Sequence, residues 1–109
     1  MILGGDAEHK RRLKKSRKQE EKTAARYKGS RNAGSGSGWM RKNDVRSHEF
    51  LIENKFTDNT KQYSVKIKDL IELEQRAIFE DRIPLLQFEI QNRRYVILTE
   101  DDFTSMLNG

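Results

Sequence analysis

The stretch that decides the fold expected for this chain is Asn-Asp-Val-Arg-Ser-His-Glu-Phe-Leu-Ile-Glu-Asn-Lys, residues 43–55. Its second half begins with an apolar, strand-like run, and successive side chains of a strand point to opposite faces. Glu53 and Lys55 therefore share one face of the expected strand. The polar residues 46–49 favour a turn that folds the stretch into a hairpin. Such a hairpin places Asp44 next to Glu53.

Asp44 and Glu53 would then be two carboxylates a few ångströms apart, and such a pair repels unless a proton or a cation lies between them. Mg²⁺ suits the pair because it takes oxygen ligands and is often held by one or two carboxylates together with substrate phosphates. Lys55 would face the bound water and the phosphate, which is typical of metal-assisted phosphodiester hydrolysis. The pattern is short, however, and occurs by chance in highly charged chains. The alternative is a half-buried strand in which Glu53 and Lys55 are only solvated.

The same residues resemble the signature of the PD-(D/E)xK nuclease superfamily, although Asn43 stands where the superfamily name has proline. Asp44 matches the first acid of the signature, and Glu53-Asn54-Lys55 matches its second motif. The surroundings resemble the small Holliday junction resolvases of archaea and phages, and the likeness covers about residues 16 to 103. Three segments carry it: Gly-Ser-Gly-Ser-Gly at 34–38, Lys-Asn-Asp-Val at 42–45 and Leu-Ile-Glu-Asn-Lys-Phe-Thr at 51–57.

This resemblance implies an α/β, restriction-endonuclease-like fold with a central mixed β-sheet flanked by helices. It also implies a metal-dependent, structure-selective DNA endonuclease that resolves Holliday junctions. In that reading Asp44 and Glu53 bind Mg²⁺ or Mn²⁺, and the carbonyl of Asn54 is a candidate third ligand. Lys55 orients and helps to deprotonate the attacking water and stabilises charge on the phosphate.

Further site residues follow from the resemblance. These nucleases usually carry a glutamate on the first helix that points at the metal, and Glu20 fits this place best, with Glu21 as the alternative. Either acid could instead face solvent and pair with a basic neighbour. In the resolvases a serine of the matching Gly-Ser-Gly element lies near the scissile phosphate, so Ser35, or else Ser37, is expected there unless the segment is a flexible linker. Lys61 is a candidate contact to the DNA backbone.

The positive charge of the chain is concentrated near its start. Residues 1–42 contain thirteen Lys or Arg and four acids, whereas residues 43–109 contain nine and thirteen. A basic half favours a polyanion, above all nucleic acid, over a membrane surface, because no apolar face accompanies the charges. We expect residues 1–18 to be a basic arm that contacts DNA, or else a solvated helical extension, and residues 19–109 to be one nuclease domain. The arm residues predicted to bind DNA are Arg11, Arg12, Lys14, Lys15, Arg17 and Lys18.

The composition of the chain excludes several classes of protein. The chain has no cysteine and two histidines, which excludes disulfide scaffolds and argues against a zinc site. No apolar run approaches the roughly 20 residues that span a bilayer, so we expect no membrane association and a cytoplasmic protein of a prokaryotic or phage-infected cell. A chain of 109 residues has a modest core, and resolution of a junction needs two symmetric nicks, so we expect a homodimer.

The expected elements run in the order αβββαββα, provided that one strand is short or that the segment 56–63 is extended. A helix should cover residues 16–28, with Glu20, Thr23, Ala24 and Tyr27 on one face, and a strand should cover 39–45 before the strand that begins at Phe50. A second helix, over 65–81 and capped by Ser64, should bury the stripe Ile67, Leu70, Ile71, Glu74, Ala77 and Ile78. Strands over 84–90 and 94–98 and a short helix capped by Thr99 complete the chain.

Three other functions remain open at this point. The first is a nuclease of the same fold that cuts flapped, single-stranded or plain duplex DNA, because the motif reports chemistry and not the shape of the substrate. The second is a non-catalytic DNA-binding module in which the acids are structural. The third is an RNA-binding or assembly protein, which the arm alone would suit but which gives no reason for Asp44, Glu53 and Lys55.

Overall fold

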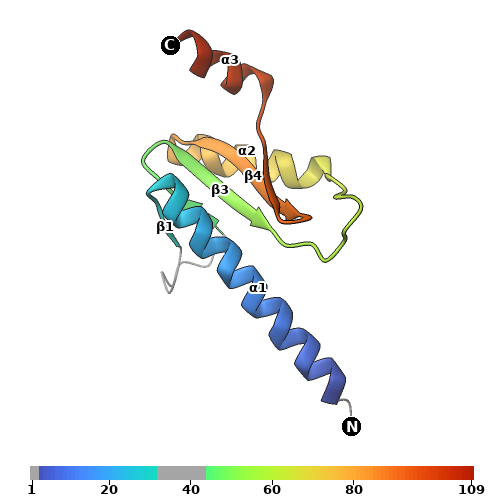
Figure 1. Cartoon of the computed structure of the whole chain (residues 1–109). Coiled ribbons are helices and arrows are strands. Elements are labelled where there is room, and N and C mark those ends of the chain that lie inside the picture. The colour runs from blue at the N-terminus through green and yellow to red at the C-terminus, as the bar shows by residue number, and fades with distance from the viewer. Residues whose placement is uncertain (1–2, 32–43) are drawn as a thin grey trace.

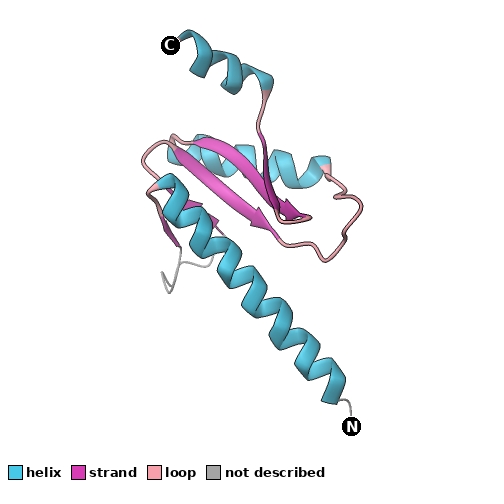
Figure 2. Cartoon of the chain, in the orientation of Figure 1, coloured by secondary structure: helices cyan, strands magenta, loops and turns pink. Residues whose placement is uncertain are grey.

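The computed structural model describes residues 3–31 and 44–109 as one α/β unit with a five-stranded mixed sheet and three helices (Figures 1 and 2). The expected strand over 39–45 falls largely outside the described residues. The elements are α1 (Leu3–Tyr27), β1 (Ser30–Arg31), β2 (Asp44–Arg46), β3 (Phe50–Lys55), α2 (Ile67–Glu80), β4 (Ile83–Ile90), β5 (Arg93–Ile97) and α3 (Glu100–Asn108).

The strands lie in sequence order, β1-β2-β3-β4-β5. All neighbours are antiparallel except β3 and β4, which are parallel and joined through α2. The hairpin of β2 and β3 pairs Asp44 with Glu53, which confirms the predicted register. The two-residue strand β1, paired with β2, was not anticipated.

Each face of the sheet has its own hydrophobic cluster. On one face Leu51 packs with Leu73 and Ala77 of α2, and on the other Ile52 packs with Val45 and with side chains of α1. Figures 1 and 2 show the two helices on opposite sides of the sheet. Because Leu51 and Ile52 are neighbours in β3, the alternation expected for this strand is confirmed. Glu53 and Lys55 consequently belong to the α2 face.

Helix α2 is present as predicted, but its phase and its cap are not. Its cap position is Lys66, without a side-chain hydrogen bond, so the prediction of Ser64 as the cap is wrong. Leu73 and Ala77 are buried, whereas Ile67, Ile71 and Ile78 of the predicted stripe are 69%, 46% and 78% exposed. The helix is rotated because two of its charged side chains, Arg76 and Glu80, make ion pairs over the sheet.

The first and last helices differ in how they join the body. Helix α1 runs without a break through the basic segment and packs Gln19, Glu20 and Thr23 against the sheet (Figure 1). Helix α3 buries none of its residues and stands away from the sheet, although Thr99 caps it through the amide of Asp102, as predicted. Within the described part of the chain, no helix has both the length and the apolar character that a bilayer crossing requires.

Candidate functional site

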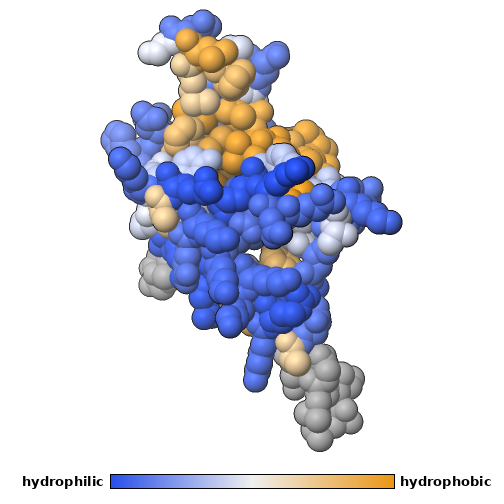
Figure 3. Space-filling model, in the orientation of Figure 1, coloured by the Kyte–Doolittle hydropathy of each residue, from blue (hydrophilic) through white to orange (hydrophobic). Residues whose placement is uncertain are grey.

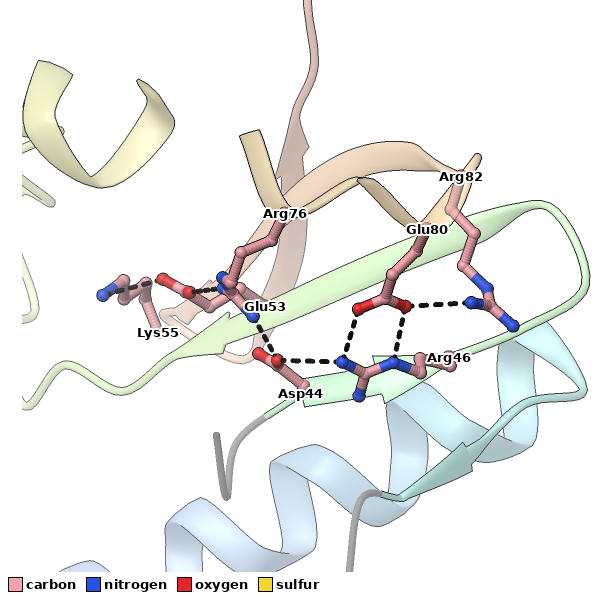
Figure 4. Close-up of polar contacts among 7 residues, drawn as sticks. All are labelled: Asp44, Arg46, Glu53, Lys55, Arg76, Glu80 and Arg82. Carbon is pink, nitrogen blue, oxygen red and sulfur yellow. Dashed lines mark hydrogen bonds and ion pairs between the residues drawn. The ribbon is translucent and has the colours of Figure 1, made fainter. Parts of the chain in front are cut away.

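The predicted acids and lysine come together where β2 begins and β3 ends. Asp44 lies opposite Glu53 in the ladder, and both side chains are buried. Lys55 follows two positions later on the same face, and its Nζ lies 2.8 Å from Glu53 Oε2 and 3.5 Å from Asp69 Oδ2. Figure 4 shows these groups in a line across the two strands. Of the residues predicted to be catalytic, the structure brings these three together.

Arg76 of α2 is the cation that holds the two carboxylates. It donates one hydrogen bond to Asp44 Oδ2 and another to Glu53 Oε1, so one guanidinium bridges the pair (Figure 4). Sequence reasoning missed Arg76, because the predicted apolar stripe of α2 placed it on the solvent side. A signal was available: Arg76 and Glu80 are four residues apart and therefore share a helix face.

A second ion-pair group lies beside the first. Glu80 accepts two hydrogen bonds of 2.7 Å from Arg46, in the bidentate geometry that favours strong charge-assisted pairing. Arg82 donates to Glu80 at 2.9 Å and to the carbonyl of Ser47 at 3.0 Å. The hydrogen bond from Arg46 is the main reason why the pKa of Glu80 is lowered. Arg46 Nη2 also lies 3.8 Å from Asp44 Oδ2, so Arg46 connects this second group to the carboxylates of the first.

Burial sets the electrostatics of Asp44. Its exposed fraction is 0%, and this burial raises its pKa, while the charge and hydrogen bond of Arg76 act in the opposite direction. Asp44 Oδ1 is buried and accepts no hydrogen bond within the described part of the chain. A buried carboxylate oxygen without a donor is costly unless a cation or water approaches it. Asp44 therefore has unused capacity for a cation.

Lys55 is a cation in this environment. Burial alone would lower its pKa, but the hydrogen bond and the charge of Glu53 outweigh burial, and the pKa lies above its ordinary value. An ammonium group donates hydrogen bonds and has no lone pair with which to accept a proton. The arrangement therefore suits Lys55 to orienting and charge-stabilising work more than to proton abstraction.

Glu20 does not join this cluster in the described structure. It lies on α1, on the other side of the sheet, and its Oε1 is 3.4 Å from Arg31 Nη2. Burial raises its pKa. Glu21, the alternative, is 3.7 Å from the same arginine. Within residues 3–31 and 44–109, no group of three or more acidic, histidine or cysteine side chains is placed to hold a metal ion.

Asn54 points to the α1 face, where its side chain accepts a hydrogen bond from Thr23. Beside it, Gln19 of α1 donates to the carbonyl of Lys55 at 3.0 Å and to Gln87 at 2.7 Å. These buried hydrogen bonds hold α1 against the end of β3. They join residues far apart in the chain, so the sequence did not predict them.

The residues predicted to bind DNA are distributed unevenly. Ser35 and Ser37 lie outside the described residues. Lys61 is exposed in the loop that follows β3, where its amide donates to Asn59 at 2.8 Å. The six basic residues of the arm are all exposed on α1: Arg11, Arg12, Lys14, Lys15, Arg17 and Lys18.

Two of the arm residues have partners within the chain. Arg11 pairs with Glu8 and lies 3.4 Å from Asp58. Arg12 lies 3.4 Å from the same aspartate and stacks over the ring of Phe56, 5.2 Å from its centre. These contacts connect the middle of α1 to the loop after β3.

Comparison with known proteins gives no relative: the chain matches no protein-family model, no curated protein and no solved structure.

Proposed function

We propose that this chain is a metal-dependent, structure-selective DNA endonuclease, with the Holliday junction as its preferred substrate. The observation that carries the proposal is the convergence of Asp44, Glu53 and Lys55, with Asp44 Oδ1 buried and without a donor in the described chain. The order α-β-β-β-α-β of the first six elements is the core that the resemblance to PD-(D/E)xK nucleases implies, and it supports a restriction-endonuclease-like fold.

The donor set suits a hard divalent cation. Asp44 and Glu53 offer carboxylate oxygens, which Mg²⁺ and Mn²⁺ prefer, and the carbonyl of Asn54 is a further candidate ligand. A bound ion would lower the pKa of a water molecule and screen negative charge on the phosphate. In the described state Arg76 supplies the positive charge between the carboxylates, so it must move aside for an ion to enter. Glu20 would join only if it left Arg31.

Lys55 provides the second function of the site. As an ammonium beside Glu53, it can donate a hydrogen bond to the attacking water and hold it in line with the phosphorus. The same charge stabilises the extra negative charge that develops on the phosphate during attack. Glu53 fixes the position of Lys55 through their 2.8 Å ion pair.

Two symmetric nicks require two sites, so we propose a homodimer. Candidate interface side chains are the exposed apolar residues of the last helix, namely Phe103, Met106 and Leu107. Figure 3 shows hydrophobic surface between that helix and the sheet.

One observation favours a second candidate, a DNA-binding module without catalysis. Arg76 neutralises both carboxylates in the described state, as it would if the acids served only to hold α2 on the sheet. A further alternative keeps the same active site and changes only the substrate, to flapped, single-stranded or duplex DNA.

A cleavage assay separates these functions. A labelled four-way junction, a linear duplex and a splayed flap are incubated with Mg²⁺ or with EDTA, using the wild type, Glu53→Gln and Glu49→Gln. Glu49 is exposed in the turn between β2 and β3 and serves as the matched control. Paired nicks in the junction alone, lost with EDTA and with Glu53→Gln, support the proposal. Cutting of all three substrates would rule out selectivity for the junction. Binding without cutting would favour the non-catalytic DNA-binding module.

A further inference from the structure

Helix α1 carries an oblique row of positive charge that continues beyond the predicted arm. Its members recur every four residues, which places them on one ridge of the helix. The row covers sixteen residues of helical rise, about 24 Å, and every member is exposed. Like charges at this spacing repel one another and destabilise an isolated helix. The row consists of Lys10, Lys14, Lys18, Lys22 and Arg26.

The second half of this row borders a groove. One wall is α1, and the other is formed by the loop after β3 and the tight turn between β4 and β5. Two depressions share Lys22, Glu89 and Asn92, so they adjoin, and we treat them as one channel along the helix. We call this channel the basic groove and define it by Lys15, Lys18, Lys22, Arg26 and Arg93.

The acids that line the basic groove are already paired. Glu89 accepts a hydrogen bond from Arg94, and Asp58 lies within ion-pair distance of Arg11 and Arg12. By contrast, the five cations that define the groove form no ion pair with any side chain in the described part of the chain. The groove therefore has a net positive charge that the chain itself does not neutralise.

We propose that the basic groove binds the sugar-phosphate backbone of duplex DNA, with one strand running along α1. This rests on the proposed function only for the choice of DNA as the polyanion. Duplex DNA carries one phosphate per strand for about every 3.4 Å of its axis, so a row of about 24 Å is long enough to meet several phosphates. The groove would read the backbone and not the bases, because the ring of Phe56 is covered by Arg12.

An acidic membrane is a poorer match. Binding to a bilayer surface needs large apolar side chains beside the charges, and Leu13 is the one large hydrophobic residue exposed on the described side chains of α1. Figure 3 shows this side of the molecule as mostly hydrophilic.

The basic groove reaches the end of β3, on the α1 face of the sheet. Phe56, which lines the groove, directly follows Lys55, and Gln19 binds the carbonyl of Lys55 from α1. A backbone held in the groove thus passes the end of β3, whereas the side chains of Asp44 and Glu53 lie on the opposite, α2 face of the sheet. The first half of α1 projects beyond the sheet (Figure 1), which lengthens the contact past the edge of the body.

Binding is tested by fluorescence anisotropy with a labelled duplex in EDTA, so that cleavage plays no part. The groove variant is Lys18→Gln/Lys22→Gln/Arg93→Gln. The control is Lys28→Gln/Lys66→Gln/Lys68→Gln, which removes the same charge from exposed positions outside the groove. The groove variant should bind at least ~30-fold more weakly, with a salt dependence shallower by about 2 to 3 in logarithmic slope. The control should stay within about 3-fold of the wild type, and circular dichroism verifies that both variants fold.

Equal loss in both variants, or no loss in the groove variant, would overturn the proposal. So would tighter binding of poly-glutamate than of DNA, since that would indicate an acidic protein partner. The outcome is separate from that of the proposed function. Glu53→Gln must keep its DNA affinity, because Glu53 lies on the α2 face and does not line the groove. DNA binding by the groove without any cleavage would refute the proposed nuclease activity and would still support the proposed role of the groove.

Discussion

Replacing Arg76 with alanine should be among the most destabilising single changes on α2. The guanidinium is the shared partner of two buried carboxylates, and its own side chain is 15% exposed. Removing one partner of a buried ion pair leaves uncompensated charge and typically costs about 3 to 5 kcal/mol. Lys55 remains 2.8 Å from Glu53, so Asp44 bears most of the loss. We expect a decrease of about 3 kcal/mol in the free energy of unfolding near neutral pH.

The pH dependence has a defined sign. Burial already raises the pKa of Asp44, and Arg76 is the main influence that opposes it. Without Arg76 this pKa rises further above its value in the unfolded chain. A carboxyl group with a raised folded-state pKa contributes stability below its unfolded pKa and loses that contribution as pH rises through the folded value. The deficit of Arg76→Ala should therefore be larger at about pH 8 than at about pH 5.

Urea unfolding of the wild type, Arg76→Ala and Arg82→Ala at the two pH values measures this. Arg82→Ala is the control, because it removes the same charge while Arg46 continues to hold Glu80. We expect it to cost no more than about 1 kcal/mol. A deficit for Arg76→Ala that equals the control, or that is larger at the acidic pH, would refute the ion-pair account of Asp44.

Three further changes test other parts of the structure. Gly29→Ala would place a Cβ 2.5 Å from the carbonyl oxygen of Arg46, so thermal unfolding should show a loss of about 1 to 3 kcal/mol; an unchanged midpoint would contradict the close approach of the chain there. Glu80→Gln should cost about 2 kcal/mol at neutral pH. Because the pKa of Glu80 is lowered, this difference should fade as pH falls through the folded-state pKa, and urea titration that shows the opposite trend would count against it. Thr99→Ala should weaken α3 locally by about 1 kcal/mol and speed its amide exchange without moving the global midpoint, since that helix buries no residue; a shifted midpoint would mean that α3 is part of the core.

The hairpin was predictable because its signal is local. Alternating side chains around Leu51 and a polar turn are enough to pair Asp44 with Glu53, and the structure has that register. The cap at Thr99 was predictable for the same reason, since an N-cap depends on a few adjacent residues. The parallel pairing of β3 with β4 depends on how α2 crosses the sheet, and no local pattern specifies it.

The phase of α2 was not predictable from hydrophobicity. Ile67, Ile71 and Ile78 make a better apolar stripe than the face that is buried, which includes Arg76 and Glu80. Charged residues enter an interior only when partners on other elements compensate them, and those partners lie on β2 and β3. A reading of α2 alone therefore assigns its charged residues to the solvent side. Glu20 was expected at the site from the resemblance alone, and in the structure its partner is Arg31 of β1.

The most direct test of the account is whether Asp44 and Glu53 bind a divalent cation. Binding of Mn²⁺ at neutral pH can be followed by electron paramagnetic resonance for the wild type, Asp44→Asn and Arg76→Ala. We expect binding by the wild type, loss of binding in Asp44→Asn, and tighter binding in Arg76→Ala, because the competing guanidinium is gone. Absence of Mn²⁺ from both the wild type and Arg76→Ala, or binding that Asp44→Asn leaves unchanged, would contradict it.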